Sequence, residues 1–561
     1  MRYRWNSVAF LVGVAVVLGG FGAVAAGPVI EQVGLFPPSD AVRFYHARVE
    51  LSASDADYVV TEASLGGMSD VFITLVDGAL HQYREDRGVN RGLNGTVPAG
   101  GKATFYIRCP WENGETYDVS LKGTAGEALA LAASVTAPAE GGFPYPGWTK
   151  HRVLVLREDF GIERENEPFL LFLSDEAGNV ASWKKELRVA KYDLATGATE
   201  EIPSQVLYEK RRFDTPVQQD TYTTCQAAFL TDVPANGKAY YLIAFGNPKA
   251  EAAAYETDLT VGKRDDGATW IENAFYELKL HPDCRQIKGF RSKVYGKGDE
   301  RGFGLNPDNK YALHYNPDVW VKNRSWTHTN GWNPPPNETT ESGPVVVVTR
   351  RWGHLPRARE VEVEVVYHFF SQAPYCLIES TMDVLQDVVV NALRNEEVVT
   401  SPPEEVDHAG WRRPNGELAY KPTTQEPGMT PGMVGIIEPD APYVCLAREA
   451  DGLGMASLRL SQHAGSRGDQ DPVIASTMTV IADYGWGFRY WSRSQVYPWG
   501  DHLVDQPTVL NAGTYYGERS ALCLFPLGEG DSPKERLAYL EALYERLSHP
   551  VRIDHQGAGP W

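Results

Sequence analysis

The stretch Arg359-Glu-Val-Glu-Val-Glu-Val-Val-Tyr-His-Phe369 decides the fold class of this chain. In an extended chain, successive side chains point to opposite faces. One face then carries Val361, Val363, Val365, Tyr367 and Phe369, and the other carries Glu360, Glu362, Glu364 and His368. A strand with one apolar and one charged face is typical of a large antiparallel sheet that packs on one side only. The charged face is either solvated or lines a cleft.

Alternating runs continue on the N-terminal side of this strand. Ile271-Glu-Asn-Ala-Phe-Tyr-Glu-Leu-Lys-Leu280 alternates and ends at a turn over 281–283. Asn113-Gly114 predicts a hairpin between strands over 103–107 and 117–121. We therefore predict a mainly β, multi-domain fold of β-sandwiches. Its units are an immunoglobulin-like β-sandwich over 28–140, a small β-sandwich over 150–262 and a large antiparallel β domain over 268–531.

One helix is predicted, within a C-terminal helix and tail over 532–561. Ser532 is the expected N-cap, Pro533 takes the first helical position, and Glu535 completes a capping box. An apolar stripe follows at helical spacing, made of Leu537, Leu540, Tyr544 and Leu547. We expect this stripe to pack the helix onto a core.

Composition and charge limit the partners. The 561 residues include 53 Lys plus Arg and 73 Asp plus Glu, which gives a formal net charge of −20. So acidic a chain lacks the basic field required for unselective binding to nucleic acid or anionic lipid. Residues 1–26, with Arg2 and Arg4 before an uncharged apolar run, predict a signal peptide, and an N-terminal membrane anchor is the alternative. We expect a secreted or periplasmic protein without stable membrane insertion after signal cleavage.

Cysteines and acidic pairs give little support for a metal. The six cysteines form no CxxC pair, so they predict no zinc cage, and both disulfides and buried free thiols stay open. They are Cys109, Cys225, Cys284, Cys376, Cys445 and Cys523. Asp469 and Asp471 could help to hold a structural or catalytic Ca²⁺, but their spacing matches no EF-hand loop. We predict no cofactor and no metal site.

A family resemblance rests on three stretches. Ile271-Glu-Asn-Ala-Phe-Tyr-Glu-Leu-Lys-Leu-His-Pro282, followed by Ile287-Lys-Gly-Phe-Arg291, resembles the opening hairpin of galactose-mutarotase-like β-supersandwich domains. Such domains form the C-terminal half of several polysaccharide lyases and of α-mannosidase-type hydrolases. Asn166-Glu-Pro168, the run 231–241 and Phe245-Gly-Asn-Pro248 are similar to the smaller sandwich of exo-rhamnogalacturonan and exo-polygalacturonate lyase-like proteins.

The resemblance covers about 150–530. It implies a β-supersandwich over 268–531 and a polysaccharide substrate that contains uronic acid. This chain is shorter than typical members of that family, and the family's catalytic residues have no motif match in it.

A basic, tryptophan-rich window between 310 and 359 is the first candidate binding site. A pyranose ring packs well on Trp, and Arg binds a carboxylate, so such a window suits an acidic sugar. The alternative places the Trp side chains in the core and the Arg side chains at its rim. The candidate substrate-binding residues are Trp320, Lys322, Arg324, Trp326, His328, Trp332, Arg394, Trp411, Arg489, Trp491 and Arg493.

The catalytic candidates follow from the chemistry of β-elimination on a uronate. That reaction requires a group that neutralises the carboxylate, a base and an acid. His408 suits the base and Arg412 the neutralising group, and the alternative for His408 is an exposed loop histidine. Tyr315, beside His314, is the candidate acid.

The sequence therefore predicts a secreted polysaccharide lyase acting on an acidic polysaccharide, with no nucleic-acid partner. A glycoside hydrolase on the same scaffold is one alternative. Hydrolysis normally requires two carboxylates, about 5–5.5 Å apart for retention or about 6.5–9.5 Å for inversion. The carboxylate candidates are Glu404, Glu405, Asp407, Asp501 and Asp505. A non-catalytic carbohydrate-binding or cell-surface protein is the other alternative.

Overall fold

The computed structural model describes residues 27–556 with several gaps. The gaps are 37–46, 54, 68–70, 77–78, 83–94, 108–113, 138–144, 214–220, 298–300, 306–312, 325, 401–405, 424–432, 438–439, 475–477, 484–488, 497–506. The predicted signal peptide, Cys109 and four hydrolase candidates (Glu404, Glu405, Asp501 and Asp505) therefore lie outside the described residues. Among the residues that are described, no helix combines the length and the apolar character needed to cross a membrane.

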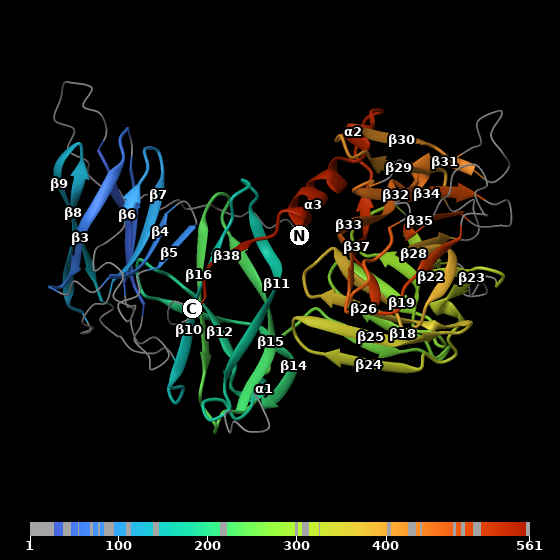
Figure 1. The fold of residues 1–561 in the computed structure, drawn as a ribbon, viewed down its shortest axis with the longest axis horizontal. Coiled ribbons are helices and arrows are strands. Elements are labelled where there is room, and N and C mark those ends of the chain that lie inside the picture. Colours follow the sequence, from blue (N-terminus) through green and yellow to red (C-terminus); the bar gives the residue numbers. More distant parts are fainter. Residues whose placement is uncertain are drawn as a thin grey trace, which may run out of the picture.

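Two sheets form an N-terminal β-sandwich (Figure 1). The first contains, in spatial order, β1 (Val29–Leu35), β2 (Ala47–Ser52), β7 (Lys102–Ile107), β4 (Val71–Val76) and β5 (Ala79–Gln82). The second contains β6 (Gly95–Val97), β3 (Tyr58–Leu65), β8 (Thr116–Ala125) and β9 (Glu127–Thr136). The predicted hairpin between β7 and β8 is wrong, because the two strands belong to different sheets. β8 instead turns tightly into β9 at Gly126, whose φ of 80° suits glycine.

A middle sandwich follows. Its first sheet contains β13 (Thr199–Ile202), β12 (Arg188–Tyr192), β16 (Lys238–Phe245), β10 (Lys150–Arg157) and β38 (Arg552–Gln556). Its second contains β11 (Arg164–Glu176), β15 (Thr221–Val233) and β14 (Ser204–Phe213), and the short helix α1 (Trp183–Glu186) lies beside them. The last strand, β38, was not expected in this unit. The chain returns from the C-terminal lobe to add it to the edge of β10.

Three antiparallel sheets form the C-terminal lobe. The β17–β21 sheet contains β17 (Thr260–Lys263), β18 (Thr269–Glu272), β19 (Tyr276–Leu280), β20 (Ile287–Ser292) and β21 (Gly302–Phe303). The seven-stranded sheet contains β23 (Trp326–His328), β22 (Leu313–Val321), β28 (Val388–Thr400), β35 (Arg489–Val496), β34 (Met478–Asp483) and β31 (Met433–Ile437), with β36 (Thr508–Leu510) beside β28. The nine-stranded sheet contains β24 (Asn337–Ser342), β25 (Val346–Leu355), β26 (Ala358–Phe370), β27 (Tyr375–Val384), β37 (Thr514–Pro526), β33 (Leu453–Ser466), β32 (Tyr443–Arg448), β29 (His408–Arg412) and β30 (Leu418–Pro422). A mainly β, multi-sandwich fold is thus confirmed.

Strand β26 shows how the nine-stranded sheet is covered. Its predicted apolar face is buried in the largest core, which the three sheets share. Glu360 and Glu364 on the other face are partly exposed and pair with Arg324 and Arg350. His368 on that same face is buried, because the far end of the strand lies under the middle sandwich and the C-terminal helix. The charged face is therefore solvated over only part of its length.

The C-terminal helix forms where predicted, in two pieces: α2 (Pro533–Arg536) and α3 (Ala538–Ser548). The expected capping box is present, with the Ser532 hydroxyl accepting from the backbone N–H of Glu535. Leu540 and Leu543 of α3 are buried against the outer face of the nine-stranded sheet. The helix therefore has a packing role.

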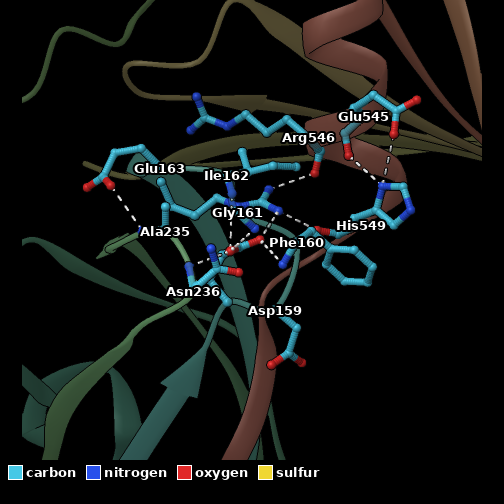
Figure 2. Close-up of polar contacts among 12 residues, drawn as sticks. Asp159, Phe160, Gly161, Ile162, Glu163, Ala235, Asn236, Glu545, Arg546 and His549 are labelled. Atoms are coloured by element: carbon cyan, nitrogen blue, oxygen red, sulfur yellow. Dashed lines mark hydrogen bonds and ion pairs between the residues drawn. The ribbon is translucent and has the colours of Figure 1, made fainter.

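A buried ion pair of the middle sandwich, Glu158 with Arg164, lies against the end of α3. Figure 2 labels residues around it, among them Phe160, Asn236 and Arg546. The Glu158 carboxylate accepts four backbone N–H groups, those of Phe160, Gly161, Ile162 and Asn236. Arg164 contacts Glu158 at 3.4 Å and donates to the carbonyl oxygens of Arg546, at 2.7 Å, and of His549. Because these carbonyls end a helix and lack intrahelical partners, Arg164 caps α3 from another unit.

The five cysteines that the structure describes are free thiols, and all five are buried. They are Cys225, Cys284, Cys376, Cys445 and Cys523. Burial raises the pKa of the Cys445 thiol to about 12, so it remains protonated and packs as a small apolar side chain. The buried-thiol alternative therefore holds for these five residues.

Candidate functional site

A hairpin and its neighbouring strand bring polar residues to one face of the seven-stranded sheet. In the antiparallel pair β22–β23, Asp318 lies opposite His328 and Trp320 lies opposite Trp326. Directly opposed residues share a face. The intervening residues of β22 are buried in the core, so this face points away from it. On the other side of β22, strand β28 places Arg394 opposite Asp318.

Arg394 binds two carboxylates at once. Its Nε lies 2.7 Å from Oδ1 of Asp318, and one terminal nitrogen bonds the other oxygen of that carboxylate. The same nitrogen lies 2.7 Å from Oε1 of Glu397. His328 closes the group, with Nδ1 2.9 Å from Oδ2 of Asp318 and 3.6 Å from Oε2 of Glu397. We call these four residues the β22–β28 cluster.

The cluster shifts the protonation of two of its members. Burial alone raises the pKa of Asp318, but the charge of Arg394 and hydrogen bonds from Arg394 and His328 outweigh it and lower that pKa. Burial likewise lowers the pKa of His328, but its pairing with Asp318 and the charge of Glu397 outweigh it and raise the pKa above its usual value. His328 is therefore a protonated imidazole over a wider pH range than a free histidine.

The open side of the cluster is His328. Its side chain is 29% exposed, whereas Asp318 is fully buried and Glu397 is 10% exposed. Nδ1 is buried against the carboxylates, 2.9 Å from Asp318, so the exposed part of the imidazole lies elsewhere on the ring. Trp326 lies over Arg394, 3.8 Å from guanidinium carbon to ring centroid, and Trp320 lies 5.4 Å from Trp326. Two aromatic rings thus border the exposed imidazole.

The same residues satisfy the spacing of a cation site. Asp318, His328 and Glu397 each offer one ligand atom within 4.8 Å of the others. Arg394, however, already donates to both carboxylates and supplies their positive partner. We therefore describe the cluster as a network of ion pairs that holds a protonated His328, and not as a metal centre. Asp469 and Asp471, the candidate Ca²⁺ ligands, are exposed and belong to no such grouping in the described part of the chain.

The sequence pointed to four of these six residues and assigned no role to Asp318 or Glu397. Trp320, Trp326, His328 and Arg394 were predicted as substrate-binding residues, and that role stays a prediction. The missed signal was the turn between β22 and β23. Asn323, with φ of 62°, makes a tight turn that folds Asp318 back onto His328. A hairpin register drawn through Asn323 would have paired the two residues.

His408 and Arg412 do not converge with this site. Both lie on β29 of the nine-stranded sheet. His408 stacks on Tyr420, with ring centroids 5.1 Å apart, and its Nδ1 lies 2.9 Å from Asp407. Arg412 pairs with Glu545 of α3 at 2.7 Å. The expected meeting with the 314–328 segment therefore does not occur, because that segment belongs to the seven-stranded sheet.

Other predicted residues have packing roles or reach solvent separately. Tyr315, the candidate acid, is buried in the core, where burial raises its pKa far above the usual value. Trp332 and Trp411 are also core residues. Arg493 is buried between the sheets and bonds Glu396 and Glu518.

Two predicted residues are exposed at the β22–β23 turn. Lys322 reaches solvent, and Arg324 pairs with Glu360 at 2.9 Å. The side chains of His314, Arg489 and Trp491 lie outside the described residues.

Comparisons with known proteins give the context. No family model matches the chain, and no curated protein matches it. Similar solved structures include an α-mannosidase from Enterococcus faecalis V583, at 12% identity and TM-score 0.42, covering 72% of this chain and 46% of that one. Another is a Glycosyl Hydrolase Family 38 protein from Enterococcus faecalis, at 13% identity and TM-score 0.42, covering 72% and 48%. A family 36 α-galactosidase from Geobacillus stearothermophilus follows at 11% identity and TM-score 0.26, covering 48% and 40%.

These comparisons correct two expectations. The similar structures are glycoside hydrolases, so the resemblance to exo-rhamnogalacturonan and exo-polygalacturonate lyase-like proteins is wrong, and so is the polysaccharide-lyase activity that it implied. The chain spans at most about half the length of these structures. Since the TM-scores are below 0.5, they assign neither residues nor an activity to this chain.

Proposed function

We propose that this chain is a carbohydrate-active protein that hydrolyses a glycosidic bond at the β22–β28 cluster. One observation carries the proposal: an imidazole with a raised pKa faces solvent beside a pair of tryptophan rings. Sugar rings pack on aromatic faces, and glycoside cleavage requires a proton donor for the leaving oxygen. Residues 1–26, read as a signal peptide, would direct the protein to a substrate outside the cytoplasm.

In the proposed reaction, each residue of the site other than Arg394 has one role. Nε2–H of His328 donates its proton to the glycosidic oxygen as the bond to the anomeric carbon breaks. The oxygen of a water molecule bonds that carbon, and Glu397 takes the proton released by the water. Asp318 is a positioning residue, since it is fully buried and stabilises the imidazolium through Nδ1. Trp320 and Trp326 pack against the sugar ring.

A non-catalytic sugar-binding role is the second candidate, and one observation favours it. Arg394 donates to both carboxylates of the cluster. A carboxylate that accepts a charge-assisted hydrogen bond is a weaker base, so this pairing limits the ability of Glu397 to activate water. The aromatic pair would then bind a sugar without turnover.

Product analysis separates the two candidates. The protein is incubated with a panel of neutral and acidic glycans while reducing ends and the ultraviolet absorbance of unsaturated products are followed. Hydrolysis predicts new reducing ends without new absorbance. Glu397→Gln should lower the rate by about 10²–10⁴-fold. The matched control Glu364→Gln, which changes a partly exposed glutamate paired with Arg350, should not. Binding without reducing ends would refute hydrolysis and support the second candidate.

A further inference from the structure

A cleft lies between the β17–β21 sheet and the first two strands of the nine-stranded sheet, and its lining includes no residue of the β22–β28 cluster. Its volume is about 380 Å³, within the range of small-molecule sites. It is lined by Val261, Gly262, Lys263, Thr269, Leu280, Arg285, Glu338, Thr339, Thr340, Thr349, Arg350 and Arg351. Six of its lining residues, in 338–340 and 349–351, belong to the basic window that the sequence predicts as a binding site, whereas the proposed hydrolysis does not use this cleft.

Two residues of β25 that line the cleft each hold a buried polar atom without a partner among the described residues. Thr349 is 9% exposed, and its hydroxyl has no hydrogen-bond partner in the described structure. Arg351 is 2% exposed, and its Nε–H is also without a partner there. The two residues are two positions apart on one strand and so share a face. A buried polar group without a partner costs about 1–3 kcal/mol, so a ligand that accepts from both groups is favoured.

The guanidinium of Arg351 is held in place but is not neutralised. It donates to the carbonyl oxygen of Cys284 at 2.7 Å and to the hydroxyl of Tyr367 at 2.9 Å. Both acceptors are uncharged, so the positive charge of Arg351, which lines the cleft, is not neutralised by an ion pair among the described residues. In a chain of net charge −20, such a local positive charge favours the binding of an anion at this cleft.

Three other cationic side chains line the cleft, and two of them form ion pairs with glutamates. Arg285 is matched by Glu338, with Nε 3.0 Å from Oε2. Arg350 is matched by Glu364 at 2.7 Å. Lys263, exposed at the end of β17, forms no ion pair with any residue that the structure describes. Lys263 and Arg351 therefore give the cleft its uncompensated positive charge.

The remaining lining residues indicate what the uncharged part of the ligand would contact. Val261 and Leu280 form an apolar wall, and Thr269 and Thr340 add hydroxyl groups. We propose that the cleft binds a sugar unit that carries an oxyanion, a carboxylate or a sulfate, which accepts from Thr349 and Arg351. The oxyanion is inferred from the cleft alone. That a sugar carries it rests on the proposed carbohydrate activity.

Calorimetric titration of the full chain tests this inference. The probes are galacturonate, N-acetylglucosamine 6-sulfate, neutral galactose, acetate and inorganic sulfate. We expect at least one acidic sugar to bind more tightly than galactose, and the preferred acidic sugar tells carboxylate from sulfate. Equal binding of galactose and the acidic sugars, or binding of none of them, would overturn the proposal. Acetate or sulfate binding as tightly as the acidic sugar would overturn the sugar part and leave the oxyanion site.

Two variants locate the binding. Thr349→Val keeps the side-chain volume and removes the unpartnered hydroxyl, so it should weaken binding by about ten- to hundredfold. It should leave the thermal midpoint unchanged or raised. Lys263→Gln should weaken binding by up to about fivefold at low salt. The matched control Lys249→Gln removes an exposed lysine of the middle sandwich and should have no effect. Unchanged affinity in Thr349→Val would overturn the assignment.

The two proposals can fail separately. Thr349 lies on the nine-stranded sheet and Glu397 on the seven-stranded sheet. Hydrolysis lost in Glu397→Gln while sugar binding persists in the cleft supports both sites. Binding in the cleft by a protein without hydrolysis refutes the proposed function alone.

Discussion

Replacing Arg394 by methionine tests whether the β22–β28 cluster is held together by one buried cation. Arg394 and Asp318 are almost fully buried, and Arg394 bonds Glu397 as well. The variant leaves two carboxylates beside one imidazole without their main positive partner. Removing one member of a buried pair costs about 3–5 kcal/mol of folding free energy. Arg350→Met is the matched control, because its two-bond pairing with Glu364 is more than one third exposed and worth about 1 kcal/mol or less.

The assay is denaturant unfolding followed by tryptophan fluorescence, together with hydrogen exchange over β22 and β28. Adding Asp318→Asn to Arg394→Met should recover part of the loss, because the buried charge that lacked its partner is removed. The reasoning would be refuted if Arg394→Met cost no more than Arg350→Met. It would also be refuted if Asp318→Asn made the Arg394→Met protein less stable.

Three further predictions concern pH, the aromatic pair and the junction between lobes. Asp318 has a lowered pKa, so its contribution to stability is complete above about pH 4, its ordinary pKa, and is lost as pH falls through the lowered pKa. His328 has a raised pKa, so its contribution is complete below about pH 6.5, its ordinary pKa, and is lost as pH rises through the raised pKa. Unfolding of this lobe should therefore be hardest between these values, and His328→Gln should abolish the alkaline loss. Trp326→Ala should weaken sugar binding about tenfold with little change in stability. Trp332→Ala, in the core, should instead cost about 3–5 kcal/mol, and a stable Trp332→Ala protein would contradict this assignment. Arg164→Met should speed hydrogen exchange at the end of α3 by removing its cap, and unchanged protection there would argue against the junction.

Local sequence patterns predicted the local structure well. The alternation of 359–369 predicted β26, and Ser532 with Glu535 predicted the start of the helix. Both signals act between residues close in sequence, so the sequence alone contains them. The predicted hairpin at Asn113-Gly114 failed because strand partners are chosen by packing across a sheet. The return of β38 to the middle sandwich depends on a strand about 400 residues earlier, and no local pattern reports it.

The candidate site shows the same contrast between local features, which the sequence predicts, and long-range pairing, which it does not. Trp326, His328 and Arg394 were recognisable as residue types that bind sugars or protons. Asp318 and Glu397 gained their importance only when β28 paired with β22 and brought Arg394 between them. His408 and Arg412 had suitable chemistry, but β29 places them on another sheet, where stacking on Tyr420 and pairing with α3 engage them. Residue chemistry could be predicted from sequence, and its convergence in space could not.

The rate at which the protein releases reducing ends from a glycan, compared with that of His328→Gln, tests the central claim most directly. If His328 is the proton donor, the variant should be folded, bind the same glycan and release reducing ends about 10²–10⁴-fold more slowly. The wild-type rate should also fall as pH rises through the raised pKa of His328. An unchanged rate in His328→Gln, or no reducing ends from the wild-type protein on any glycan of the panel, would contradict the account.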